Sequence, residues 1–312
     1  IIAICDIMNM YDRPCRIPRN SKRYTDNMNI MQEILKHEDY MIEQRRYLHR
    51  HPETSAAEFK TIEHLSEELT AMGIPHDVVE DGGILAYIEG KQPGKTVLLR
   101  ADCDALKMSE QPNNLKQPKV AVSENPGACH ACGHDGHSAT LLTVGKVLFE
   151  HKDEIHGTVI LMFERGEEGA HCVTCLFRHI EDKGFKIDTI YGNHVYNGLK
   201  TGEIALLDGP TMSGSMVFDV KITGRGGHGS RPDLSVNPVD CFVAVYNDIN
   251  ALRMKKISPF RTLTFSVGKL ISGGVLNIIP DDLSFGGTVR VFDLEDGRTF
   301  LKQLKTILDH DC

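Results

Sequence analysis

The sequence predicts an α/β fold with a mainly parallel sheet and helices on both faces, followed by a smaller α+β unit. Three observations carry this prediction. Over residues 70–207, short apolar runs alternate with helical stretches, as is typical of parallel sheets covered on both faces. From Asp208 the order becomes strand, helix, strand, strand, helix. The length of 312 residues is about twice the ~150 residues of one domain, which favours two domains.

Composition narrows the class of protein. The chain is 41% hydrophobic and 25% charged, which is ordinary for a globular protein. A net charge of −8, few aromatic residues and no Trp argue against nucleic-acid binding. No stretch approaches the ~20 apolar residues of a membrane span. We therefore expect neither nucleic acid nor a membrane as a partner.

The N-terminal segment differs from the rest. Residues 1–27 show neither an amphipathic period nor a secretory signal, so we interpret them as an N-terminal extension. The fold is expected to begin near Met28, with a helix over Asn29–His51. Nine cysteines form an odd count without a dense framework, which predicts reduced thiols and a cytoplasmic location.

Buried strands are predicted at Thr96–Arg100, Gly157–Phe163 and Ile187–Tyr191, with a helix from the segment Cys129–His137 through Phe149. The carboxyl ends of parallel strands meet at one edge, where ligand sites gather. Polar side chains follow each strand: Asp102 and Asp104, then Glu167 and Glu168, then His194. The start of the helix belongs to the same edge, so four distant segments are predicted to converge there.

This edge has the chemistry of a metal site. Eight of the 15 histidines fall between His130 and His194, where an even distribution would give about three. Thiolate, imidazole and carboxylate together are the ligand set of a transition metal. The candidate ligands are Cys132, His134, Glu168 and His194. Of the adjacent pair Glu167 and Glu168, one can bind metal while the other takes a proton from metal-bound water.

Other interpretations compete. Cys129 and Cys132 with Cys172 and Cys175 resemble a structural four-cysteine zinc site, although the gap between the pairs is long and the histidines stay unexplained. A lone Glu pair or a single His is usually an ordinary surface or core residue. Asp102 and Asp104 are either helix caps or carboxylates that orient the metal ligands.

The second unit opens with a half-exposed strand over Ser215–Thr223. A helix follows over Asn237–Leu252, with predicted inward residues Val239, Phe242, Val243, Tyr246 and Ile249. The remaining elements are strands Arg261–Gly268 and Asp282–Phe292 and a helix over Glu295–His310. This order is a ferredoxin-like split unit without its last strand.

Three polar residues of this unit are candidates for ligand contact. His228 lies in the glycine-rich segment Gly224–Pro232, whose backbone can approach a ligand closely, although a flexible loop is the alternative. From the residues alone, Asn277 and Arg290 are interpreted as plain surface residues, with one alternative for Arg290. Arg290 could grip a carboxylate with two hydrogen bonds.

Eight short motifs together resemble peptidase family M20, and more narrowly its amidohydrolase branch of hippurate hydrolase, aminoacylases and auxin-conjugate hydrolases. They occur in the family's order and cover about residues 40–310. The motifs are His49–Glu53, Leu99–Leu106, His130–His137, Glu167–Gly169, Gly192–Val195, Gly226–His228, Asn277–Pro280 and Gly287–Arg290.

The resemblance implies a zinc-peptidase-like catalytic domain over residues 28–207 and an inserted lid over residues 208–312 that forms a homodimer. It implies two divalent metal ions, with zinc favoured and manganese, cobalt and nickel as alternatives. The implied reaction is hydrolysis of the amide bond of a small N-acyl amino acid or related conjugate by a metal-activated water.

Residue roles follow from the same resemblance. Cys132, His134, Glu168 and His194 match the metal ligands, and Glu167 matches the general base. His228 matches the lid histidine that enters the partner subunit's active site and stabilises the oxyanion. Asn277 and Arg290 match positions that hold the substrate carboxylate.

Two departures from the family pattern are visible. Glu164, Arg165 and Gly166 replace the usual Gln-Pro-Ala, and we expect the added charges to alter substrate choice. The family's last metal ligand is a His in a returning segment, whereas this chain ends at Cys312. We therefore expect a fragment that lacks the C-terminal part of both domains and has weak or no activity. The alternatives are a truncated relative and a non-catalytic binding or dimerisation protein of the same fold.

Overall fold

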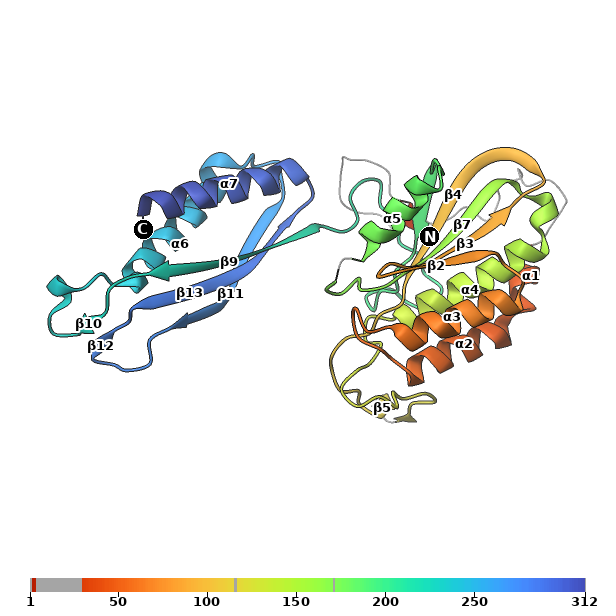
Figure 1. Ribbon diagram of the computed structural model, residues 1–312, viewed down its shortest axis with the longest axis horizontal. Coiled ribbons are helices and arrows are strands. Elements are labelled where there is room, and N and C mark those ends of the chain that lie inside the picture. Colours follow the sequence, from red (N-terminus) through yellow and green to blue (C-terminus); the bar gives the residue numbers. More distant parts are fainter. Residues whose placement is uncertain (1, 4–29, 115–116, 171, 312) are drawn as a thin grey trace. The chain divides into compact units, whose positions relative to one another are not determined.

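The computed structural model describes residues 2–3, 30–114, 117–170 and 172–311. Its contacts divide the chain into two compact units, one with the described residues up to Leu207 and one with those from Asp208 onward (Figure 1). The predicted N-terminal extension, residues 1–27, lies outside the described residues except for Ile2 and Ala3.

The first unit is built on a six-stranded sheet in the order β1-β8-β4-β7-β3-β2. Its strands are β1 (Ile2–Ala3), β2 (His76–Val79), β3 (Gly83–Glu89), β4 (Gln92–Asp102), β7 (His156–Glu164) and β8 (Thr189–Gly192). The central strands β8, β4 and β7 are parallel, whereas β3 and β1 pair antiparallel with their neighbours. Because β2 is antiparallel to β3, four of these six described strands run in one direction. The prediction of a mainly parallel sheet is confirmed.

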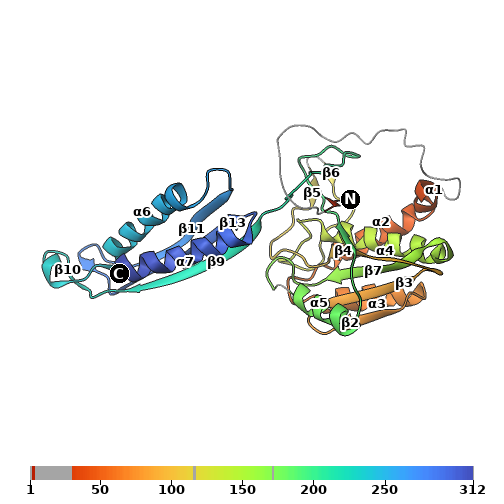
Figure 2. The same cartoon turned by 90° about the horizontal axis from the view of Figure 1, so that it is seen from above.

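Helices cover both faces of this sheet (Figures 1 and 2). The helices are α1 (Ile30–Leu35), α2 (Glu38–Arg50), α3 (Phe59–Ala71), α4 (His134–Glu150) and α5 (Val173–Asp182). Ile84, Ala86 and Ile88 of β3 pack into the core beneath α3 and α4. Leu85, between them, packs on the opposite face with Leu176 of α5. The strand's side chains alternate between the two faces because their period is two.

The first predicted helix is wrong in one respect. Instead of one helix over Asn29–His51, α1 ends at Leu35 and α2 begins at Glu38. The backbone N–H groups of Lys36 and His37 bond to carbonyls three residues earlier, at 3.2 and 3.0 Å. This tighter turn interrupts the α-helical hydrogen bonding.

The second unit has the predicted order of elements. They are β9 (Gly214–Thr223), α6 (Pro238–Lys256), β11 (Leu263–Ser272), β13 (Asp282–Val291) and α7 (Leu294–Asp311). The sheet is antiparallel in the order β11-β13-β9. The shorter elements of this unit are β10 (Gly227–His228) paired with β12 (Ile278–Ile279) and a 3₁₀ turn at Pro232–Leu234. The first unit has β5 (Asn113–Asn114) paired with β6 (Gln117–Pro118) and a 3₁₀ turn at Lys152–Glu154.

The buried face of α6 differs from the prediction. Val245, Ile249 and Leu252 are buried against the sheet, whereas Val243 and Tyr246 are 51% and 40% exposed. Val239, also predicted inward, is 36% exposed. Apolar residues form two stripes along this helix. One stripe includes Val245, Ile249 and Leu252 and is covered by the sheet, whereas the other includes Val239, Val243 and Tyr246 and is more exposed. Periodicity alone cannot choose between two stripes of similar apolar character.

Most of the described cysteines are free thiols. Cys103, Cys129, Cys132, Cys172 and Cys175 are free thiols. Cys241 is disulfide-bonded, so the expectation of reduced thiols holds for those five and is wrong for Cys241. The cytoplasmic location stays a prediction. None of the described helices is long and apolar enough to span a bilayer.

Candidate metal centre

The ends of three parallel strands form the candidate site. Along β4, Arg100 pairs with Gly192 of β8 and Asp102 pairs with Glu164 of β7. The segments that follow these strands therefore leave the sheet at one edge. Helix α4 begins at His134 beside them. The four segments that the sequence predicts to converge are brought together here.

Three groups of possible ligand atoms lie at this edge, each with all its atoms within 4.8 Å of one another. The groups are Cys132, His134 and His194; Asp102, His134 and His137; and His134, Glu167 and Glu168. The Cys132 sulfur lies 3.3 Å from Nε2 of His194, and Nε2 of His134 lies 3.9 Å from a Glu168 oxygen. All four predicted ligands and the predicted base are thus gathered, with His134 common to the three groups.

His134 is held with one ring nitrogen free. The side chain is buried, and its Nδ1 lies 3.1 Å from Oδ1 of Asp104. Its Nε2 has no hydrogen-bond partner among the described residues. Burial opposes the charged ring, but the Asp104 and Asp102 carboxylates outweigh it and raise the pKa of His134. A buried nitrogen without a hydrogen bond is costly, and carboxylate oxygens of Asp102 and Glu168 lie 3.6 and 3.9 Å from it, so this atom is suited to share a cation with them.

Cys132 is a thiol in a crowded acidic setting. Burial, and then the Glu168 carboxylate, raise the pKa of the Cys132 thiol to about 12. A cation that binds the thiolate must therefore displace a proton. Zinc binds the thiolate form of cysteine. A zinc–sulfur distance is much shorter than the 3.3 Å between the Cys132 sulfur and Nε2 of His194.

Asp102 and Asp104 each contact a histidine of the candidate site: Asp102 contacts His137, and Asp104 contacts His134. Asp104 accepts a hydrogen bond from the backbone N–H of Glu168 at 2.9 Å and another from the Ser55 hydroxyl. Asp102 lies 2.6 Å from Nδ1 of His137, and this contact together with Arg100 overcomes burial and lowers the pKa of Asp102. Neither carboxylate caps α4, whose N-cap is Gly133. Their contacts favour the interpretation that they orient the ligands.

His137 is part of the motif His130–His137, but its sequence position alone predicted no role for it. Its Nε2 accepts a hydrogen bond from the backbone N–H of Val195 at 2.9 Å, directly after His194. Its ring centroid lies 4.7 Å from that of His194. The available signal is its position three residues after His134, which places both rings on one face of α4.

Glu167 is half-buried beside the candidate ligands. Burial, and then the Asp102 carboxylate, raise the pKa of Glu167 against the opposing charges of Arg100 and His134. A carboxyl group whose charged form is disfavoured in this way accepts protons more readily.

The charges at Glu164 and Arg165 are paired within the protein. Arg100 donates from Nε to Glu164 at 2.7 Å and from Nη1 to Asp102 at 2.8 Å. Arg165 donates to Glu58 at 3.1 Å. Glu164 and Arg165 are thus both buried and paired with residues of opposite charge, and the expected effect of these two charges on substrate choice stays a prediction.

The three residues of the second unit that are predicted to contact ligands lie in two places. His228 of β10 pairs with Ile278, and the backbone N–H of Gly229 donates to Asn277 at 2.8 Å, so His228 and Asn277 are neighbours. Arg290 is exposed near the other end of β13, eight residues after Asp282. At ~3.4 Å per residue this separation along the strand is about 27 Å.

The four-cysteine alternative finds no support among the described residues. Neither Cys129, Cys172 nor Cys175 belongs to any of the candidate ligand groups. Cys172 packs against Gly166, where a Cβ would lie 2.7 Å from its sulfur.

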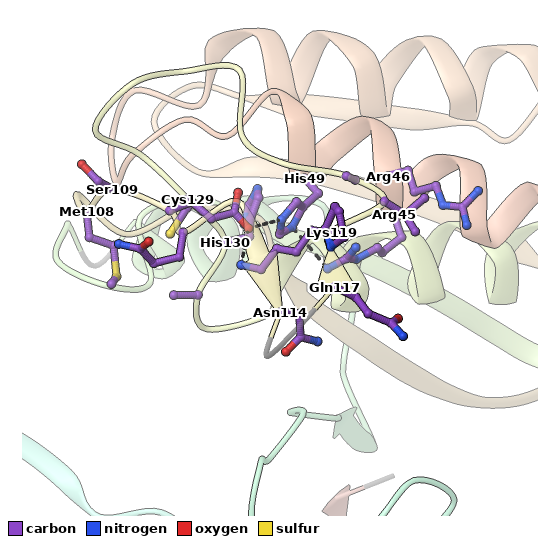
Figure 3. Close-up of a pocket in the computed structure, with 16 residues that line it drawn as sticks. Arg45, Arg46, His49, Met108, Ser109, Asn114, Gln117, Lys119, Cys129 and His130 are labelled. Atoms are coloured by element: carbon purple, nitrogen blue, oxygen red, sulfur yellow. Dashed lines mark hydrogen bonds and ion pairs between the residues drawn. The ribbon is translucent and has the colours of Figure 1, made fainter.

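A separate pocket of about 760 Å³ lies beside α2 (Figure 3). None of the predicted metal ligands lines it. Its wall includes His49, Lys119 and Glu110, and Glu110 accepts hydrogen bonds from Lys119 at 2.8 Å and from the backbone of Ser123 at 2.6 Å. His130, also in the wall, is buried, and neither ring nitrogen has a partner in the described part of the chain.

Together, the fold and the site define an α/β protein whose sheet carries a candidate metal centre of cysteine, histidine and carboxylate side chains at its carboxyl edge. The chain belongs to peptidase family M20/M25/M40, whose model matches residues 98–297.

Named relatives agree with this membership. The chain is 34% identical over 273 residues to IAA-amino acid hydrolase ILR1-like 4 of Arabidopsis thaliana, covering 86% of this chain and 60% of that protein. It is 32% identical to N-acyl-L-amino acid amidohydrolase of Geobacillus stearothermophilus, covering 85% and 70%. The chain thus spans about 60% of the length of the first of these relatives.

Solved structures show the same fold. A candidate aminohydrolase of methicillin-resistant Staphylococcus aureus matches with a TM-score of 0.81 and 30% identity, covering 89% of this chain and 73% of that one. A dinuclear metal-binding peptidase of family M20 from Bacillus subtilis matches with a TM-score of 0.68 and 26% identity, covering 90% and 70%.

Proposed function

We propose that this chain carries the metal-binding part of a hydrolase that cleaves the amide bond of N-acyl amino acids or related conjugates. The observation that carries the proposal is His134, which belongs to all three ligand groups and whose buried Nε2 has no hydrogen-bond partner among the described residues. The names of the two relatives, an amino acid conjugate hydrolase and an N-acyl amino acid amidohydrolase, support this substrate class.

The residues fit a divalent metal pair. Thiolate, imidazole and carboxylate donors suit zinc, with manganese, cobalt or nickel as alternatives. The residues that would hold the ions are Cys132, His134, Glu168 and His194, with Asp102 and Asp104 orienting them. When bound, such ions polarise the substrate carbonyl and make water more acidic.

In this proposal Glu167 is the general base. It takes a proton from the attacking water and passes it to the leaving nitrogen. Its partly buried position beside His134 and its raised pKa support the assignment.

We further propose that the second unit is a lid that forms a homodimer. His228 would stabilise the oxyanion of the partner's substrate, while Asn277 and Arg290 would contact the substrate carboxylate. Because Arg290 and Asn277 lie far apart along the unit, one copy cannot apply both to a single carboxylate. The proposal therefore requires a second copy, in which Asn277 accompanies His228.

Zinc content and turnover test the proposal together. After exposure to Zn²⁺ and dialysis, the chain is expected to retain zinc, and His134→Ala is expected to lose it. In a full-length version of the protein, Glu167→Gln is expected to retain zinc while hydrolysis of an N-acetyl amino acid falls by about 10²–10⁴-fold. Glu181→Gln, an exposed change on α5, is the control. Failure of the unaltered chain to hold zinc contradicts the metal centre, and unchanged turnover in Glu167→Gln contradicts the base assignment.

A further inference from the structure

We propose that Glu58 and Arg165 are positioning residues for the Glu167–Glu168 turn, an inference that rests on the proposed function. Glu58 is fully buried, and its two carboxylate oxygens have separate tasks. One accepts a hydrogen bond from Nε of Arg165 at 3.1 Å. The other accepts from the backbone N–H of Gly166 at 2.8 Å. Glu58 thus fixes the two residues that come directly before the proposed base.

Arg165 completes this connection on its other side. Its Nη2 donates to the carbonyl oxygen of Ala56 at 3.1 Å, and its guanidinium lies 4.9 Å from the centre of the Phe59 ring. The side chain is 8% exposed. A guanidinium with its hydrogen bonds and its face already engaged within the protein is suited to hold backbone in place.

A strained residue supports the same inference. Ala56 has φ of 66°, a left-handed conformation that is unfavourable for a residue with a Cβ. The backbone N–H of Ala56 donates a hydrogen bond to Glu58 at 3.1 Å, and the carbonyl oxygen of Ala56 accepts one from Arg165. Strain of this kind persists where the surroundings fix it, and it gathers at functional sites.

The turn is also held from the side beyond Glu167. Ser55 donates to Asp104, and the same Asp104 oxygen accepts from the N–H of Glu168 at 2.9 Å. The segment Ser55–Glu58 therefore restrains the backbone both before and after Glu167. Its function is to fix the direction in which the proposed base and the proposed ligand point.

The test measures zinc affinity, which a purely structural contact would leave unchanged in a folded variant. Glu58→Gln keeps the shape of the side chain but leaves Arg165 without a charged partner. By analogy with other groups that support metal ligands, the dissociation constant for Zn²⁺ alone, measured against a chromophoric chelator, is expected to rise about 10-fold or more. In a full-length version of the protein, kcat is expected to fall with little change in KM.

Asp77→Asn is the matched control, because Asp77 pairs with Lys183 at 2.6 Å and His179 at 3.0 Å away from the ligand groups. Its zinc affinity is expected to stay within about twofold of the unaltered chain. Circular dichroism establishes that each variant is folded. A folded Glu58→Gln with unchanged zinc affinity would overturn the inference, whereas an unaltered chain that binds no zinc contradicts the proposed function instead.

If Glu58→Gln does not fold, Arg165→Lys provides the same test. Lysine keeps the positive charge beside Glu58 but lacks the planar fork that reaches both Glu58 and the Ala56 carbonyl. Zinc binding is expected to weaken by about threefold, less than for Glu58→Gln, because the Gly166 hydrogen bond is kept. Affinity equal to that of the unaltered chain would overturn the inference.

Discussion

At the scale of a single residue, Gly133 separates Cys132 and His134, two of the proposed metal ligands. Its φ is +91°, and a Cβ there would lie 2.4 Å from the Val195 side chain, next to His194. Gly133→Ala is therefore expected to destabilise the protein by about 1–2 kcal/mol and to weaken zinc binding. Urea unfolding and zinc titration measure both effects.

Gly136→Ala is the control for this prediction. Gly136 lies three residues later within α4, and a Cβ there meets nothing within 4 Å. Alanine at this position is expected to stabilise the protein by about 0.5–1 kcal/mol. Equal effects of the two substitutions would contradict the account of Gly133.

Glu110 gives a prediction about pH. Burial opposes its charge, but Lys119, the Ser123 backbone and His49 outweigh burial and lower the pKa of Glu110 to about 2. A lowered folded-state pKa means that the contribution to stability is complete above the usual carboxyl pKa and is lost as the pH falls from about 4.5 to 2.

Glu110→Gln is therefore expected to cost about 1–3 kcal/mol at pH 7, with the difference from the unaltered chain closing towards pH 2. Urea unfolding at pH 7, 4 and 3 measures this difference. A gap that stays constant over this range would contradict the charge-dependent role of Glu110.

At the scale of elements, α6 has two apolar stripes with different energetic weight. Ile249 is fully buried in the core of the second unit, whereas Val243 is 51% exposed. Ile249→Ala is expected to lower the free energy of unfolding by about 2–5 kcal/mol, and Val243→Ala by less than about 0.5 kcal/mol. Urea unfolding of the two variants distinguishes them, and equal losses would mean that both stripes are covered.

The same scale explains what could be predicted from the sequence. The ends of β4, β7 and β8 were predictable because apolar runs are followed directly by polar residues, and parallel strands bring those ends together. The roles of His137 and Glu58 were not, because each depends on a backbone N–H that lies far away in the chain, at Val195 and Gly166. Periodicity reports which side of a helix is apolar and carries no information about such partners.

At the scale of the whole molecule, each unit has its own core. The clusters of the first unit draw on residues between Tyr40 and Ile190, and that of the second on residues between Met216 and Leu308. The segment between them, residues 193–213, forms no helix or strand and contains Lys200, which is exposed. Separate cores that need no shared residues can unfold separately.

We therefore expect limited trypsin digestion to cleave the chain after Lys200. An exposed irregular segment fits into the active site of a protease more easily than a helix or a strand does. The fragment that begins at Thr201 is expected to keep its helical circular dichroism and to unfold cooperatively in urea, since its core is intact. The Ile249→Ala substitution should lower its stability by about the same 2–5 kcal/mol as in the whole chain. A fragment without a cooperative transition would mean that this core depends on residues of the first unit.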